Sequence, residues 1–222
     1  MAFFRCELVD PSLSVAERAA IGLGPDPLVA QRIKATKWWN PWAQASGLRR
    51  AVRQLERPYD HVSLLLAMQA DAVRFRDLAT ANPITADTAA EAARSLSWLL
   101  WHTADRIDAI AAIEAELDAD DGTGGPAKAQ WMDQKRHQRD ELLATITAGV
   151  AQVKALADLA EETSYAARLA LEQQPSIELA APTAREITAG DDMEAATEAL
   201  TALHDAWIDL DVRLRRSGPS NP

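Results

Sequence analysis

The sequence predicts an all-α protein, namely an elongated antiparallel helical bundle or coiled coil with three to four long helices preceded by short N-terminal helices. Three observations lead to this prediction. Alanine supplies 45 of the 222 residues, and leucine, glutamate, glutamine and arginine are also abundant, all of them strong helix formers. Proline and glycine are confined to a few positions that leave long stretches uninterrupted. Within those stretches, apolar residues recur at alternating spacings of three and four, which places them on one face of a helix.

The N-terminal part is divided into short helices by capping signals. Ser14 and Glu17 have the spacing of a capping box, in which each side chain satisfies a free backbone donor of the first turn. This first helix is expected to end near Gly22 or Gly24. Two further helices are predicted over about 27–38 and 41–56, because each starts with an Asp-Pro or Asn-Pro pair that suits a helix N-terminus.

The remaining chain is predicted to form the long helices. The first covers about 59–80, and the second starts at a capping box beginning at Thr88 and ends near residue 118. Residues 127–174 contain no proline and a single glycine, which leaves open whether they form one helix or a broken one. The last helix starts at 191 or 192, and its apolar residues keep the heptad spacing throughout: Met193, Ala196, Leu200, Leu203, Trp207, Leu210 and Leu214.

Three parts of the chain follow from these elements. Residues 1–58 form a tryptophan-rich basic segment of short helices, 59–216 form the long-helix bundle, and 217–222 are a flexible tail. The single cysteine, Cys6, excludes an internal disulfide and a zinc site built of thiolates. No uncharged apolar stretch reaches the roughly 18 residues needed to cross a bilayer, and the N-terminus carries acidic residues, so a cytoplasmic location is expected.

The charge of the protein is segregated along the chain. The net charge is -10, from 33 acidic and 23 basic side chains. Within residues 32–57, seven cations face one glutamate, which gives +6 there and leaves -16 for the rest. Three of the seven tryptophans lie in the same window. Its candidate partner-binding residues are Trp38, Trp39, Trp42, Arg49, Arg50 and Arg53.

Three interpretations of this window are open. Its tryptophans can close the end of the bundle while its arginines pair with acidic helices, since cations often lie on the face of a tryptophan. It can also dock a protein partner or a second copy of the chain, because tryptophan and arginine are enriched in binding hot spots. Nucleic-acid or membrane binding is the third interpretation, and the -16 on the remaining chain argues against it.

No motif in the sequence predicts catalysis or a cofactor. The histidines, His61, His102, His137 and His204, fall on four different predicted helices, and none has the spacing of a known helical metal site. His102 with Asp105 one turn later has the spacing of an oriented base. A solvated helix face is the simpler interpretation of Asp133, His137 and Glu141, which share an i, i+4, i+8 stripe, and no metal site is predicted.

The sequence therefore favours a non-enzymatic helical interaction or scaffold protein, an adaptor or subunit of a larger assembly that docks through 32–57. A protein partner, a homo-oligomer or both are expected. The alternatives are a helical metal-dependent or ligand-binding protein that uses the histidines, and a protein that binds nucleic acid or a membrane surface through 32–57.

Overall fold

The computed structural model describes residues 3–33, 41–82, 85–120, 125–173 and 193–217. This part of the chain is mostly helical, as predicted, and it also contains a two-stranded sheet. The elements in chain order are β1 (Phe3–Val9), α1 (Val15–Ile21), α2 (Pro41–Ala51), β2 (Val52–Pro58), α3 (Tyr59–Ala81), α4 (Ala86–Asp118), α5 (Pro126–Gln173) and α6 (Met193–Ser217).

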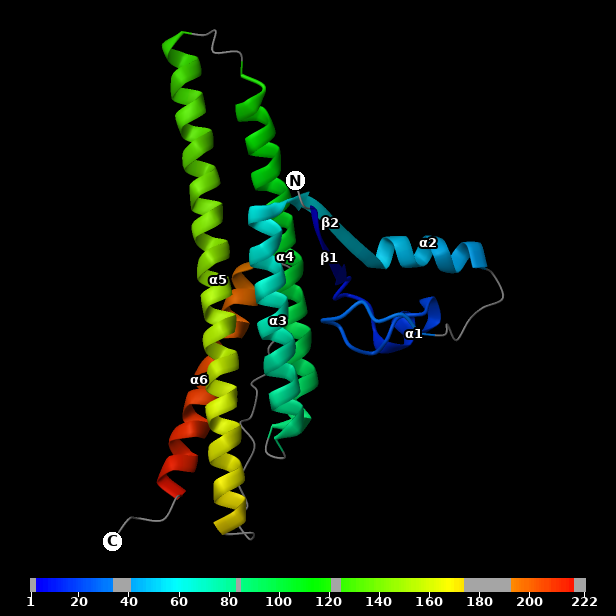
Figure 1. The fold of residues 1–222 in the computed structure, drawn as a ribbon, viewed down its shortest axis with the longest axis vertical. Helices are drawn as coiled ribbons and strands as arrows, with labels where there is room; N and C mark the ends of the chain where they lie inside the picture. Colours follow the sequence, from blue (N-terminus) through cyan, green and yellow to red (C-terminus); the bar gives the residue numbers. More distant parts are fainter. Residues whose placement is uncertain (1–2, 34–40, 83–84, 121–124, 174–192, 218–222) are drawn as a thin grey trace.

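The long helices lie side by side along the longest axis of the molecule (Figure 1). Helix α3 packs against α4 and α5, and α6 packs against the same two helices. The helix predicted over 59–80 is confirmed as α3. Pro126–Gln173 forms one continuous helix of 48 residues, α5, so the predicted stretch 127–174 is unbroken as far as residue 173. The single glycine inside it, Gly149, does not interrupt it.

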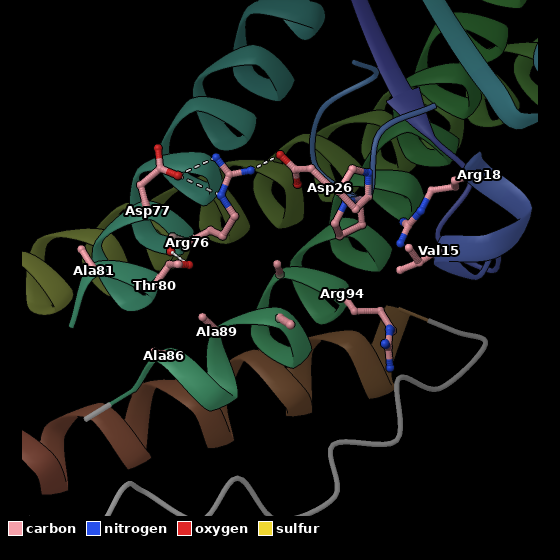
Figure 2. A pocket seen from close by; sticks show the side chains of 14 residues that line it. Val15, Arg18, Asp26, Arg76, Asp77, Thr80, Ala81, Ala86, Ala89 and Arg94 are labelled. Atoms are coloured by element: carbon pink, nitrogen blue, oxygen red, sulfur yellow. Dashed lines mark hydrogen bonds and ion pairs between the residues drawn. The ribbon is translucent and has the colours of Figure 1, made fainter. Parts of the chain in front are cut away.

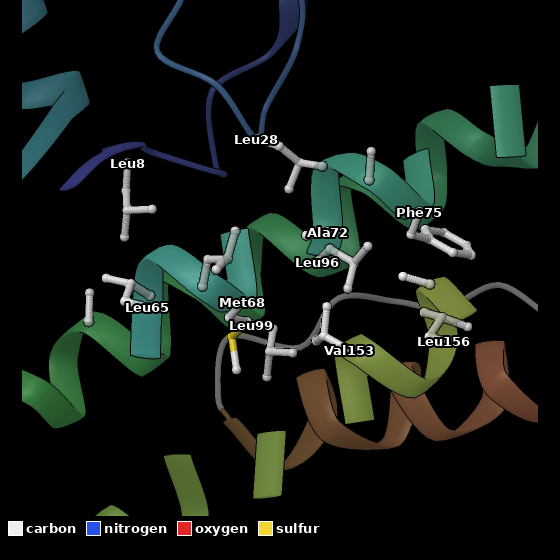
Figure 3. Close-up of a cluster of buried hydrophobic side chains, with 14 of the residues drawn as sticks. Leu8, Leu28, Leu65, Met68, Ala72, Phe75, Leu96, Leu99, Val153 and Leu156 are labelled. Atoms are coloured by element: carbon white, nitrogen blue, oxygen red, sulfur yellow. The ribbon is translucent and has the colours of Figure 1, made fainter. Parts of the chain in front are cut away.

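The core lies where α3, α4 and α5 meet. The sequence places one apolar stripe on α3, and all of it is buried: Leu65, Met68, Ala72, Phe75 and Ala79. The stripe faces apolar side chains of the two neighbouring helices (Figure 3). Helix α6 adds Trp207, whose ring packs edge-on against Phe75 with the ring centroids 5.3 Å apart. Residues at the centre of this core are Leu65, Met68, Ala72, Phe75, Leu96, Leu99, Val153 and Leu156.

Helix α5 contains a stretch, Pro126–Ala167, that by length and composition is able to cross a membrane. An 18-residue window within it has a mean hydropathy of 1.4. The expectation of no spanning stretch considered uncharged residues alone, whereas this stretch includes charged ones such as Lys154 and Asp158. Its apolar stripe, including Ile146 and Val153, is buried against the other helices. Helices in the core of a protein can have this length and composition too, so the window is weak evidence for a membrane span.

The strands correct the prediction of a helix over 41–56. Helix α2 ends at Ala51, and the chain continues as β2, which pairs antiparallel with β1 from Phe3↔Pro58 to Val9↔Val52. Leu48, Val52 and Leu55 have the i, i+4, i+7 spacing of one helix face, which favoured a helix, but Val52 and Leu55 are buried as strand residues instead. The physical reason is the partner strand, which supplies hydrogen bonds that the isolated segment lacks.

The helix predicted over 27–38 is also wrong for the residues described, up to 33. The Asp26 carboxylate does cap the backbone, because its Oδ1 accepts a hydrogen bond from the Leu28 amide at 2.9 Å. The chain then turns back, and Leu23 pairs with Arg32 in a short antiparallel bridge. Burial of Leu28 in the main core fixes this loop, which is incompatible with a helix that would carry the chain onward.

One of the two predicted capping boxes is confirmed. The Ser14 side chain accepts from the Glu17 amide, and the Glu17 carboxylate accepts from the Ser14 amide at 2.8 Å. The box predicted at Thr88 is wrong, because α4 already begins at Ala86. The Thr88 hydroxyl instead donates to the carbonyl of Thr85 at 3.0 Å.

The N-terminal segment shares the core of the long helices. Cys6, Leu8, Leu28 and Leu55 belong to the same buried cluster as α3, α4 and α5. Gln69 of α3 holds this junction, because its amide donates to the carbonyl oxygens of Leu28 at 2.7 Å and of Glu7 at 3.3 Å.

Candidate functional site

The structure places the predicted docking residues in different settings. Trp38 and Trp39 lie outside the described residues, and the side chain of Trp42, at the start of α2, does as well. Arg49 and Arg50 are exposed in the last turn of α2. These two cations are therefore the described part of the predicted surface that faces solvent.

Arg53 is bound within the protein. Its guanidinium donates from Nη1 to Asp105 Oδ1 and from Nη2 to Asp108 Oδ2, both at 2.5 Å, and it lies 5.4 Å from the centre of the Trp101 ring. Burial opposes its charge, but hydrogen bonds to Asp108 and Asp105 outweigh this effect and raise its pKa. Arg53 thus fastens β2 to α4, as expected if arginines of the basic window pair with the acidic helices.

Helix α2, which carries Arg49 and Arg50, stands to the side of the long helices (Figure 1). It packs against α1 and β2. Gly47 permits a close approach to α1, since a Cβ atom at this position would lie 3.1 Å from Ile21 Cγ2. The basic window is therefore divided between an internal clamp at Arg53 and a projecting helix.

The histidines do not assemble a metal site. No group of three or more potential ligand side chains gathers within the part of the chain that the structure describes. His61 instead lies 3.2 Å from Glu114 (Nε2 to Oε1), and His137 lies 3.2 Å from Glu141 on the exposed face of α5.

His102 is poorly placed for a base. Its Nδ1 lies 3.6 Å from Asp105 Oδ2, and its ring stacks on Trp98 with centroids 5.6 Å apart. The other ring nitrogen, Nε2, is buried and has no hydrogen-bond partner among the described residues. A base needs that nitrogen within reach of a substrate proton, and here the protein encloses it.

A pocket that the sequence did not predict lies between α1, the loop at Pro25 and Pro27, and the facing ends of α3 and α4 (Figure 2). Its volume is about 600 Å³. This value falls within the range of small-molecule sites, which is about 300–1,000 Å³. The side of the pocket formed by α4 is built of small apolar residues: Ala86, Ala89, Ala90 and Ala93.

The charged side chains of the pocket form two groups (Figure 2). At one end, Arg76 is hydrogen-bonded to the carboxylates of both Asp26 and Asp77. At the other end lie Arg18 of α1 and Arg94 of α4. The five groups carry three positive and two negative charges, so the lining has a net charge of +1 in a chain of -10.

Arg18 is the least ordinary member of this lining. The residue is 5% exposed, and its Nε is buried without a hydrogen-bond partner among the described residues. Burial and repulsion from Arg94 lower the pKa of its guanidinium, and attraction to Asp26 compensates only in part. A buried cation with incomplete pairing is costly, and such groups require an explanation.

The sequence contained a weak signal for this pocket. Ala86, Ala89, Ala90 and Ala93 have the i, i+3, i+4, i+7 spacing of one helix face, and Arg94 follows directly. Small residues in that pattern are typical of helix packing, however, so the pattern alone predicts a seam. Only the tertiary structure brings α1 and Arg18 to this face.

A second, smaller hollow of about 340 Å³ lies between α5 and α6, lined by Ala151, Gln152, Ala155, Thr201 and His204. It contains one titratable side chain and no clustered charge.

Comparison of the chain with protein-family models, curated proteins and solved structures gives no match.

Proposed function

We propose that the protein is a non-enzymatic helical interaction protein, an adaptor or subunit of a larger assembly, which docks through the basic window 32–57. In this proposal the long helices serve as an elongated antiparallel bundle, and α2 is the docking element. A cytoplasmic location, as expected from the sequence, is part of the proposal.

The observation that carries the proposal is the position of α2. It stands to the side of the long helices and presents Arg49 and Arg50 to solvent. The candidate residues Trp38, Trp39 and Trp42 come from the same part of the sequence. A projecting helix with cations and adjacent tryptophans supplies the residue types that dominate protein interfaces.

The charges also favour a protein partner over a nucleic acid. Arg53 is neutralised by Asp105 and Asp108, so it contributes little to the field that a polyanion would meet. Two exposed arginines beside a strongly acidic remainder suit a local acidic patch on a partner better than a continuous phosphate backbone.

The test is co-purification from the native host, followed by measurement of the intact mass of the complex. The variant Arg49→Glu/Arg50→Glu is expected to lose its partner or its second copy. A matched control, Arg136→Glu/Arg139→Glu on α5, makes the same change of charge far from α2 and is expected to keep it. Arg53 is left unchanged in this test, because its replacement by glutamate would break the clamp to α4.

Two results would contradict the proposal. One is a wild-type protein that is a monomer without a partner. The other is an equal loss of partner in both variants, which would indicate a general effect of charge. Nucleic-acid binding is checked with the same pair, as a salt-sensitive affinity for single-stranded DNA that falls only in Arg49→Glu/Arg50→Glu.

A further inference from the structure

We propose that the pocket between α1, α3 and α4 binds a small organic monocarboxylate with an apolar body. This site is separate from the docking element proposed above, and neither proposal depends on the other. It is defined by Arg18 and Arg94 at its cationic end and by the small residues of α4 on one side (Figure 2).

The cationic end of the pocket, formed by Arg18 and Arg94, is expected to bind an anion. Arg76 already has two carboxylate partners, whereas Arg18 and Arg94 line the other end and neither is hydrogen-bonded to a carboxylate of the described residues. A carboxylate has two oxygens with the spacing of a guanidinium fork, so it accepts two parallel hydrogen bonds from one arginine. Placed here, it would be attracted to both guanidinium groups and would reduce the repulsion between Arg18 and Arg94.

The net charge of the pocket lining favours a ligand with a single negative charge. The three arginines and two aspartates sum to +1, so one carboxylate brings the site to neutrality. A phosphate monoester, with a charge approaching -2 at neutral pH, would leave an excess of negative charge beside Asp26. The inference therefore commits to a monocarboxylate.

The rest of the lining requires an apolar body. Val15, Pro25, Pro27 and the alanines of α4 present mainly carbon to the pocket. A small polar anion such as acetate would contact the cationic end and leave this surface in water. A ring or a short alkyl chain would cover it, and burial of apolar area supplies most of the affinity in sites of this kind.

The test uses cyclohexanecarboxylate as the probe, with binding measured by titration calorimetry on the full-length protein. One-to-one binding is expected, with at least about tenfold weaker binding of the neutral cyclohexylmethanol and of acetate. Cyclohexyl phosphate is expected to bind more weakly than the carboxylate. Equal affinity for the alcohol and the carboxylate would overturn the proposal, as would a dissociation constant for the carboxylate weaker than about 10 mM.

Two variants test the location of the site without disturbing the core. Arg94→Gln removes an exposed cation, and Ala90→Phe fills the pocket from an exposed position on α4. Both are expected to weaken binding about tenfold or more. The matched controls Arg136→Gln and Ala148→Phe lie on exposed positions of α5 and should leave binding unchanged. Equal losses in variants and controls would place the probe elsewhere and refute the assignment.

Arg18→Met gives a readout that a purely structural arginine would not give. It is expected to abolish carboxylate binding, while stability without ligand stays the same or rises, because an incompletely paired buried cation is removed. A loss of both binding and stability would assign Arg18 a structural role and count against the proposal. If this variant does not fold, Arg94→Gln and Ala90→Phe still decide the question.

Discussion

Replacement of Arg53 by methionine tests whether this arginine belongs to the fold or to a docking surface. The side chain is 19% exposed, lies 2.5 Å from both Asp105 and Asp108, and covers the ring of Trp101. Methionine keeps most of the apolar stem and removes the guanidinium. The change therefore isolates the charged contacts between β2 and α4.

The expected loss follows from those contacts. Each ion pair involves an aspartate that is about half exposed, and pairs of this kind contribute about 0.5–1 kcal/mol. The contact between cation and ring adds about 0.5–1 kcal/mol. The free energy of unfolding should therefore fall by about 1.5–3 kcal/mol. For a chain of this length, that corresponds to a fall of roughly 3–12 °C in the melting temperature.

The measurement is urea denaturation followed by far-ultraviolet circular dichroism and tryptophan fluorescence. A double-mutant cycle with Asp108→Asn should give a coupling energy of about 1 kcal/mol, since both single changes remove the same contact. Arg50→Met, at an exposed position of α2, is the control and should change stability by no more than about 0.5 kcal/mol. An Arg53→Met protein as stable as the control, with no coupling to Asp108, would refute the clamp.

Three further predictions concern the core. Trp207→Ala should lower the free energy of unfolding by about 3–5 kcal/mol, measured by urea denaturation, because the ring is buried against Phe75. Gly149→Ala should raise the melting temperature or leave it unchanged, because α5 gains helix propensity and the new Cβ meets only the flexible end of Met68, 3.1 Å away, whereas Gly149→Leu should lower it. Burial raises the pKa of the Cys6 thiol from 9.0 to about 11. The free energy of unfolding should therefore fall as the pH rises from 9 towards 11, because the thiol ionises in the unfolded chain before it ionises in the folded one. Alkylation of Cys6 at pH 8 should be slow until urea unfolds the protein.

The sequence predicts the long helices well because their signals are local and repeated. In α3 and α5 the predicted bounds differ from the observed ones by one residue at most at each end. Proline interrupts the chain at Pro58 and near Pro126, and the apolar stripe of each helix recurs over many turns. Leu65 and Phe75 on α3 are both buried as their spacing predicts.

The N-terminal segment is predicted poorly because its structure depends on distant partners. In β2 the buried residues Val52 and Leu55 do not alternate with exposed ones, so the sequence lacks the period of two that indicates a strand. The partner strand, β1, lies more than forty residues earlier in the sequence. Nothing in the sequence near Val52 specifies that pairing, whereas a helical spacing of apolar residues is visible locally.

In the candidate sites, too, the sequence predicts the local features and misses those that depend on distant residues. The charge segregation identified an unusual window, but the charge of Arg53 is compensated by Asp105 and Asp108, which lie 52 and 55 residues further along the chain. The sequence cannot distinguish a compensated arginine from a free one. The sequence also does not indicate that Arg18 is unusual, because Arg94, the residue that repels it, belongs to a different helix.

Arg53, which is partly buried, is explained by the fold, whereas the buried Arg18 is better explained by a ligand. Arg53 and Arg18 both lose water around the guanidinium, and desolvation lowers the pKa of each. For Arg53, two carboxylates of α4 reverse that effect, so the folded chain supplies its own counter-ions. For Arg18 the largest effect of a neighbouring charge comes from another arginine, Arg94, and the carboxylate that attracts it, that of Asp26, is already bound to Arg76. The chain places two carboxylates next to Arg53, but next to Arg18 it leaves a pocket. The simplest explanation is that the carboxylate for Arg18 comes from a ligand.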